Sequence, residues 1–144
     1  MRTSMSGCLA ALTLAAGAVL APGAAAAETT AAALPTSTFH IKYGATWTKG
    51  KITWANRSVR VVGQHRSAVA GSAATTCRTT WAYTLKANRG VLGSDGSRTH
   101  ACGNIKSYNF TVPADIRGGA AYVRVCLDDG AYKDLKCKLI ARPA

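Results

Sequence analysis

The stretch CRTTWAYTL, residues 77–85, carries the clearest strand pattern in the chain. Successive residues of a β-strand point to opposite faces, so alternate positions share a face. One face would hold Cys77, Thr79, Trp81, Tyr83 and Leu85, and the other Arg78, Thr80, Ala82 and Thr84. Threonine and aromatic residues are also the types that strands favour. We therefore predict a β-strand over residues 77–85.

Similar short patterns recur on both sides of this strand at intervals of about ten residues. Further strands are predicted over residues 39–43, 46–48, 51–55, 58–62, 105–112, 121–127 and 135–140. We expect Lys49 and Gly50 to form a hairpin turn, residues 63–76 a loop, residues 90–97 a mobile connection and residues 128–130 the last turn. No segment has a convincing amphipathic helical pattern. The fold class is therefore predicted to be all-β: a small, disulfide-stapled antiparallel β-sandwich, or a partly open barrel, of about seven or eight strands.

The first residues have the features of a signal peptide. Arg2 gives a minimal positive region, residues 8–21 form an apolar run without charge, and Ala25, Ala26 and Ala27 offer a cleavage site. The apolar run is too short for a membrane-spanning helix, which needs about 20 residues. We expect residues 1–27 to be removed, with no membrane span, and the protein to be secreted to the extracellular space.

Two regions are expected to follow the signal peptide. Residues 28–38 are rich in alanine and threonine and contain no aromatic residue, which predicts a flexible N-terminal arm. Residues 39–144 would form the single β-sandwich domain. The arm could add itself to a cleft or to a sheet edge of a partner protein, gaining main-chain hydrogen bonds there.

Four cysteines remain after removal of the signal peptide with Cys8: Cys77, Cys102, Cys126 and Cys137. An even number in an exported chain predicts two disulfides, for which three pairings exist. We favour Cys77–Cys102 and Cys126–Cys137, because each pair flanks an expected hairpin. A zinc site is the alternative, but no two of these cysteines have the close C-x-x-C spacing. We expect neither a metal nor a cofactor.

The charge of the chain is strongly positive, with a formal net charge of +12. Nine lysines and arginines lie between residues 29 and 94, and that segment contains no acidic residue. Such a field favours acidic proteins or anionic polymers as partners. A solubilising surface explains the same charges equally well.

Catalytic residues are scarce, so we expect no enzymatic activity. The histidines are His40, His65 and His100, and no G-x-S-x-G motif accompanies them. Asp115 and Asp134 are the acid pair that a glycosidase would need, but nothing in the sequence brings them together. His40 alternates with the apolar residues of its strand and should therefore point outward.

The residues most suited to binding lie in the arm and in the segment that follows it. Tryptophan among basic residues can bind a partner by stacking and charge. Trp54 is in phase with Ile52 and should be core, whereas Trp47 lies beside the expected glycine turn and should be exposed. The predicted partner-binding residues are Glu28, Leu34, Pro35, His40, Lys42, Trp47, Lys49 and Arg57.

The stretch ITWANRSVRVVG, residues 52–63, resembles a segment of small secreted actinobacterial β-domain proteins. Within that group the chain most resembles the adaptor subunits of the umbrella toxin particles of Streptomyces. The resemblance implies a non-enzymatic connector between a lectin-bearing subunit and a repeat-containing subunit of an extracellular antibacterial toxin complex. The alternative expectation is a cationic secreted protein that binds anionic cell-wall polymer or nucleic acid, including as an antimicrobial.

Overall fold

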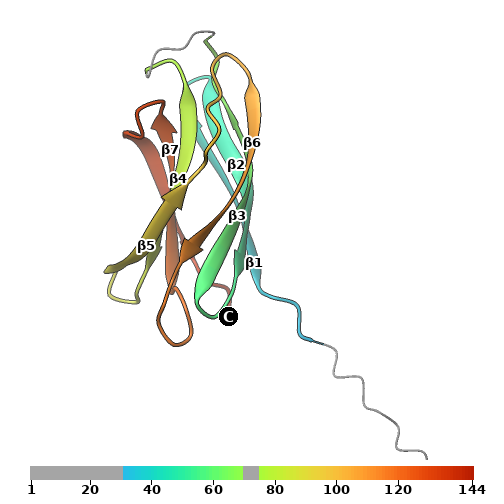
Figure 1. The fold of residues 1–144 in the computed structure, drawn as a ribbon, viewed down its shortest axis with the longest axis vertical. Coiled ribbons are helices and arrows are strands. Elements are labelled where there is room, and N and C mark those ends of the chain that lie inside the picture. The colour runs from blue at the N-terminus through green and yellow to red at the C-terminus, as the bar shows by residue number, and fades with distance from the viewer. Residues whose placement is uncertain (1–30, 70–74) are drawn as a thin grey trace, which may run out of the picture. The chain divides into compact units, whose positions relative to one another are not determined.

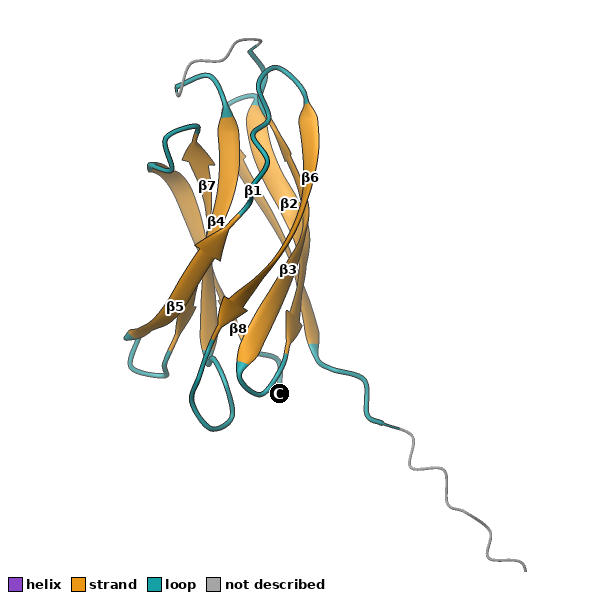
Figure 2. Cartoon of the chain, viewed as in Figure 1, coloured by secondary structure: helices purple, strands orange, loops and turns teal. Residues whose placement is uncertain are grey.

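The computed structural model describes residues 31–69 and 75–144, which form two antiparallel sheets facing one another (Figures 1 and 2). The strands are β1 (Thr36–Tyr43), β2 (Thr46–Trp54), β3 (Ser58–Arg66), β4 (Arg78–Leu85), β5 (Val91–Gly96), β6 (Ile105–Pro113), β7 (Tyr122–Asp129) and β8 (Asp134–Ala141). Sheet A has the order β1-β2-β3-β6, and sheet B the order β5-β4-β7-β8. The described residues contain no helix, which confirms the predicted all-β sandwich. None of them form a helix long and apolar enough to cross a membrane.

The core lies between the sheets and takes its aromatic side chains from sheet A. Trp54 is fully buried there, as its phase with Ile52 predicted, and its Nε1 donates a hydrogen bond to Ser37 Oγ at 3.0 Å. Sheet A supplies Phe39, Ile41, Ile52, Trp54, Val59, Val61, Tyr108, Phe110 and Val112, while the strands of sheet B supply Ala82, Val123, Val125, Leu127 and Ile140. The side chains that sheet A contributes to the core are therefore larger on average than those contributed by sheet B.

Strand β4 shows which of the two faces predicted for residues 77–85 points into the core. Thr80 and Ala82 point into the core, whereas Trp81 and Tyr83 lie on the outer face of sheet B and are partly exposed. The reason is space, because the aromatic rings of sheet A already fill the gap of about 10 Å between stacked sheets.

The expected hairpin turn at Lys49 and Gly50 is wrong, because β2 runs without interruption from Thr46 to Trp54. Gly50 lies directly opposite Gly63 of β3 on the core side of sheet A. A Cβ at Gly63 would stand 2.6 Å from the hydroxyl of Tyr108, and one at Gly50 would stand 3.0 Å from the ring of Phe39. The two glycines therefore make room for core rings rather than turning the chain.

Other boundaries also differ from the prediction. The expected last turn over residues 128–130 begins later, since β7 continues to Asp129. The expected loop over residues 63–76 begins later, since β3 continues to Arg66. The expected mobile connection over residues 90–97 contains strand β5, which pairs with β4. The expected arm over residues 28–38 is too long at its C-terminal end, because Thr36 to Thr38 pair with Thr53 to Lys51 in the sheet.

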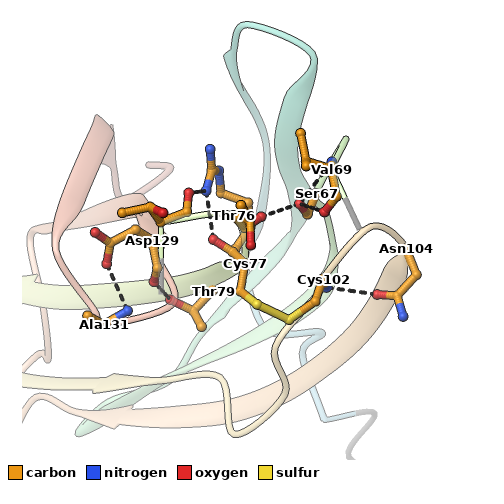
Figure 3. The surroundings of a disulfide bond; sticks show 11 residues. Ser67, Val69, Thr76, Cys77, Thr79, Cys102, Asn104, Asp129 and Ala131 are labelled. Atoms are coloured by element: carbon orange, nitrogen blue, oxygen red, sulfur yellow. Dashed lines mark hydrogen bonds between the residues drawn. A yellow bond between two sulfur atoms is a disulfide. The ribbon is translucent and has the colours of Figure 1, made fainter. Parts of the chain in front are cut away.

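Both predicted disulfides are confirmed. Cys126 and Cys137 are direct cross-strand partners on β7 and β8, with Cα atoms 4.0 Å apart. Cys77 and Cys102, 4.3 Å apart at Cα, join the start of β4 to the loop before β6 (Figure 3). Beside this second disulfide, Arg78 and Ala101 exchange two backbone hydrogen bonds of 2.8 and 3.0 Å. The loop that follows β5 is thus attached to sheet B at its far end.

Gly63→Ala should lower the free energy of unfolding by about 2–3 kcal/mol, because the new methyl group must displace a core ring or the backbone. The nearest backbone atom, Lys49 O, would be 2.2 Å from the added Cβ. Urea unfolding of the oxidised protein measures the change. Gly90→Ala is the matched control, since its nearest neighbour is a side-chain oxygen of Asn88 at 3.2 Å. Equal effects of the two substitutions would contradict the packing role of Gly63.

Candidate functional site

Four of the predicted binding residues meet on the outer face of sheet A. Strand pairing places Lys42, Trp47 and Arg66 side by side on β1, β2 and β3. The next outward row contains His40 and Lys49, which are also direct cross-strand partners. Because neighbouring strands lie about 4.8 Å apart, these five side chains form one cluster, which we call the Trp47 patch.

The Trp47 ring contacts one cation and one other aromatic ring. The Nζ atom of Lys49 lies 4.8 Å from the ring centroid, a cation–π distance. The imidazole of His40 meets the indole edge-on, with centroids 6.3 Å apart and planes at 89°. A hollow of about 390 Å³ opens beside them, lined by His40, Lys42, Gly44, Ala45, Trp47, Lys49 and Arg66. The patch therefore combines a partly exposed aromatic surface with cations and a concave floor.

Charges are divided unequally between the sheets. The strands of sheet A contain six basic residues and no acidic residue: Lys42, Lys49, Lys51, Arg60, Arg66 and Lys106. The strands of sheet B contain four of each sign: Arg78, Arg124, Lys136 and Lys138 against Asp95, Asp128, Asp129 and Asp134. The strand charges thus sum to +6 on sheet A and to zero on sheet B. Three of the six basic residues of sheet A, Lys42, Lys49 and Arg66, belong to the Trp47 patch.

The other predicted binding residues lie elsewhere. Arg57 is in the turn between β2 and β3 and forms an ion pair with Asp115, so it does not join the patch. Leu34 precedes β1 and exposes 54% of its surface, while the carbonyl of Pro35 accepts a hydrogen bond of 2.9 Å from Trp54 N–H. Glu28 lies outside the described residues.

Sequence reasoning did not include Lys51, Arg60 and Arg66 in the predicted binding set. All three are exposed and point outward from sheet A. Arg66 was placed in the loop expected over residues 63–76, and only the continuation of β3 carries it into the row with Trp47. The sequence did contain a signal for this position. Arg60, Gln64 and Arg66 are separated by even numbers of residues, so in a longer strand they share one face.

The three histidines have different surroundings. His40 is exposed, as predicted, and His100 packs its ring against Tyr132. His65 is fully buried, with Nδ1 3.1 Å from Thr80 Oγ1 and Nε2 3.5 Å from Thr99 Oγ1. Burial, with a smaller effect of His100, lowers the pKa of His65 to about 4. A neutral His65 suits a structural role between the sheets.

His65 belongs to a chain of hydroxyl contacts that crosses the core. Thr80 Oγ1 lies 2.8 Å from Thr48 Oγ1, which in turn lies 2.8 Å from the hydroxyl of Tyr108. That hydroxyl donates to the carbonyl of Lys49 at 3.2 Å. Burial raises the pKa of Tyr108 to about 12, so the phenol keeps its proton. The contacts join β4 of sheet B to the backbone beneath the Trp47 patch.

Asp128 on β7 is the most unusual titratable group among the described residues. It is fully buried, and neither carboxylate oxygen has a hydrogen-bond partner. Burial, followed by the charges of its cross-strand partner Asp134 and of Asp129, raises the pKa of Asp128 to about 7. Asp134 also lies with Cys126 and Cys137 in a group whose ligand-type atoms are within 4.8 Å. The two sulfur atoms are bonded to each other in a disulfide, whereas metal ions bind free thiolates. As a metal site, this group therefore offers only the carboxylate of Asp134.

Comparison of the chain with protein-family models, with curated proteins and with solved structures gives no match.

Asp128→Asn should stabilise the protein by about 2–4 kcal/mol near pH 8, where the wild type buries a charge. The folded carboxyl takes up its proton at about pH 7 and the unfolded one near 3.8, so this penalty disappears as the pH falls between those values. The gain from the substitution should therefore shrink toward zero near pH 4. Urea unfolding across this range measures it.

Asp115→Asn is the control for this experiment, because Asp115 is an exposed member of a surface ion pair. Its effect should stay below about 1 kcal/mol at each pH. A stability gain of Asp128→Asn that does not change with pH would contradict a buried, titrating carboxyl.

Proposed function

We propose that this chain is an exported, non-enzymatic adaptor that joins other secreted proteins and contacts an acidic partner surface through the Trp47 patch. The observation that carries the proposal is the segregation of charge: the strands of sheet A contain six basic residues and no acid. Complementary charge guides association and fixes orientation, which suits a protein whose task is to hold others together.

The composition of the patch supports protein binding. Tryptophan and arginine are the residue types that contribute most to binding energy at protein interfaces. Here Trp47 and Arg66 are adjacent on paired strands, and Trp47 lies in a lined hollow that a partner side chain could enter. The cations around the ring would occupy the rim of such an interface, where they affect association rate and specificity.

An adaptor needs a second contact, and the segment before β1 is suited to it. Leu34 is exposed, and β1 is an edge strand of sheet A. An extended segment at this position could pair with a sheet edge or occupy a cleft of a second partner. The two disulfides and the signal-peptide pattern support an extracellular site of action. The resemblance of residues 52–63 to umbrella toxin adaptors suggests lectin-bearing and repeat-containing toxin subunits as the partners.

The same field favours a second candidate function, the binding of anionic polymers such as wall teichoic acid or nucleic acid. The supporting observation is the spread of the charge, because Lys51 and Arg60 continue the positive surface beyond the Trp47 patch. Binding of a polyanion releases counterions, so affinity should fall steeply with salt. Binding of a folded acidic protein with apolar contacts at Trp47 should depend on salt less strongly.

The adaptor proposal predicts that Lys42→Glu/Lys49→Glu/Arg66→Glu loses its partners, with affinity at least about tenfold lower because like charges would face each other. Affinity purification from culture supernatant of the producing strain, with mass spectrometry, identifies the captured proteins. Purified partners then give the affinities at low and at high salt.

Lys133→Glu/Lys136→Glu/Lys138→Glu is the matched control, since it makes the same change of net charge at exposed positions around β8. It should capture the same proteins as the wild type. A strictly monomeric wild-type protein without specific partners in the supernatant would refute the adaptor proposal. Capture of teichoic acid or DNA alone, lost at high salt, would favour the second candidate.

A further inference from the structure

We propose that the outer face of sheet B carries a carbohydrate-binding pocket, formed by Trp81, Tyr132 and the loop that follows β5. A hollow of about 330 Å³ lies there, lined by Trp81, Asp95, Gly96, Ser97, Arg98 and Tyr132. These residues come from three separate segments of the chain. Neither the Trp47 patch nor the arm includes any of them, so the pocket is independent of the adaptor proposal.

The floor of the pocket depends on a glycine. Trp81 and Gly96 are direct cross-strand partners on β4 and β5. The indole lies so close to the strand that a Cβ at Gly96 would stand 2.1 Å from its Cε3 atom. With no side chain at Gly96, the indole lies over this position of β5 and remains partly exposed. The result is a flat aromatic surface at the edge of the sheet.

Tyr132 forms the adjoining wall and is held in an uncommon backbone conformation. Its φ of 62° is in the left-handed region, which costs a non-glycine residue of order 1 kcal/mol. The Asp129 carboxylate fixes this turn by accepting hydrogen bonds from the N–H groups of Ala131 at 2.8 Å and Lys133 at 3.0 Å. The phenol ring thereby stands 5.4 Å from the indole at an angle of 72°, and 42% of Tyr132 is exposed. The imidazole of His100 also contacts the Tyr132 ring, with the centroids 5.4 Å apart.

The polar side of the pocket is provided by Asp95 and Arg98. The Asp95 carboxylate accepts the N–H of Gly96 at 2.8 Å, and an Arg98 Nη2 atom lies 3.9 Å from it. The Arg98 side chain is 89% exposed, so its guanidinium donors are accessible to a ligand. Acceptor and donor groups therefore stand beside the aromatic corner.

The loop that carries Arg98 and His100 is fastened at several points. Ser97 N donates to Thr80 O at 2.8 Å, and Thr80 N donates to Ser97 Oγ at 3.1 Å. Farther along, the Arg78–Ala101 bridge and the Cys77–Cys102 disulfide attach the loop to β4 (Figure 3). A pocket formed in advance loses little freedom on binding, which favours affinity.

These features fit a sugar ring better than an ion. A pyranose has an apolar face of C–H groups, which can lie on an aromatic plane, and an edge of hydroxyls, which can bond to a carboxylate and a guanidinium. A free anion would meet Asp95 and a free cation would meet Arg98, so a neutral ligand is favoured. The volume is near the lower end for ligand pockets, which suits one or two sugar units.

The proposal is tested by NMR titration of the oxidised protein with the methyl glycosides of glucose, galactose, mannose and N-acetylglucosamine, and with chitotriose. At least one sugar should shift the Trp81 indole resonance in a saturable way. Tyr132→Gly should weaken that sugar at least tenfold while the protein stays folded, because relief of the strained φ of 62° offsets part of the lost ring contacts. Arg98→Ala should also weaken binding and leave the melting temperature unchanged.

Trp47→Phe is the matched control, since it alters an aromatic residue on the opposite sheet, and it should bind the sugar as the wild type does. The proposal is overturned if no sugar of this panel shifts Trp81 at tens of millimolar. It is equally overturned if Tyr132→Gly and Arg98→Ala both bind as the wild type, or if the shifts map to Trp47 instead.

Discussion

Two stacked sheets leave a gap of fixed width, and the way this gap is filled determines much of the molecule. All four aromatic rings of the core, those of Phe39, Trp54, Tyr108 and Phe110, come from sheet A. Sheet B can then place only smaller side chains opposite them, so its own aromatic residues must point outward. Trp81 and Tyr83 lie outside for this reason, although their strand has the strongest aromatic pattern. The filling of the core by the aromatic rings of sheet A thus also explains why the outer surface of sheet B is aromatic.

Period-two alternation made the strands predictable, because it is a local property of the sequence. The same local evidence could not show that Gly50 faces Gly63, since cross-strand register is set by residues far apart in the chain. Gly50 was therefore taken for a turn residue. For the same reason Arg66 was not predicted to lie beside Trp47, whereas His40, Lys42, Trp47 and Lys49 come from strands that are adjacent in sequence.

The two outer faces have different chemistry. Sheet A presents an excess of positive charge around one tryptophan, and sheet B presents aromatic residues with balanced charges. The His65, Thr80, Thr48 and Tyr108 contacts join the sheets internally through neutral groups. Among the described residues, the contacts that join the two unlike surfaces through the interior are thus made by uncharged groups.

The lysines of β8 have a consequence for self-association. Lys136 and Lys138 share the inward phase of Ile140, yet both are exposed, because β8 is an edge strand of sheet B. Charged residues that point inward at a sheet edge make it costly for another strand to extend the sheet. An edge of this kind resists polymerisation of identical copies. Binding partners are therefore expected at parts of the domain other than the β8 edge.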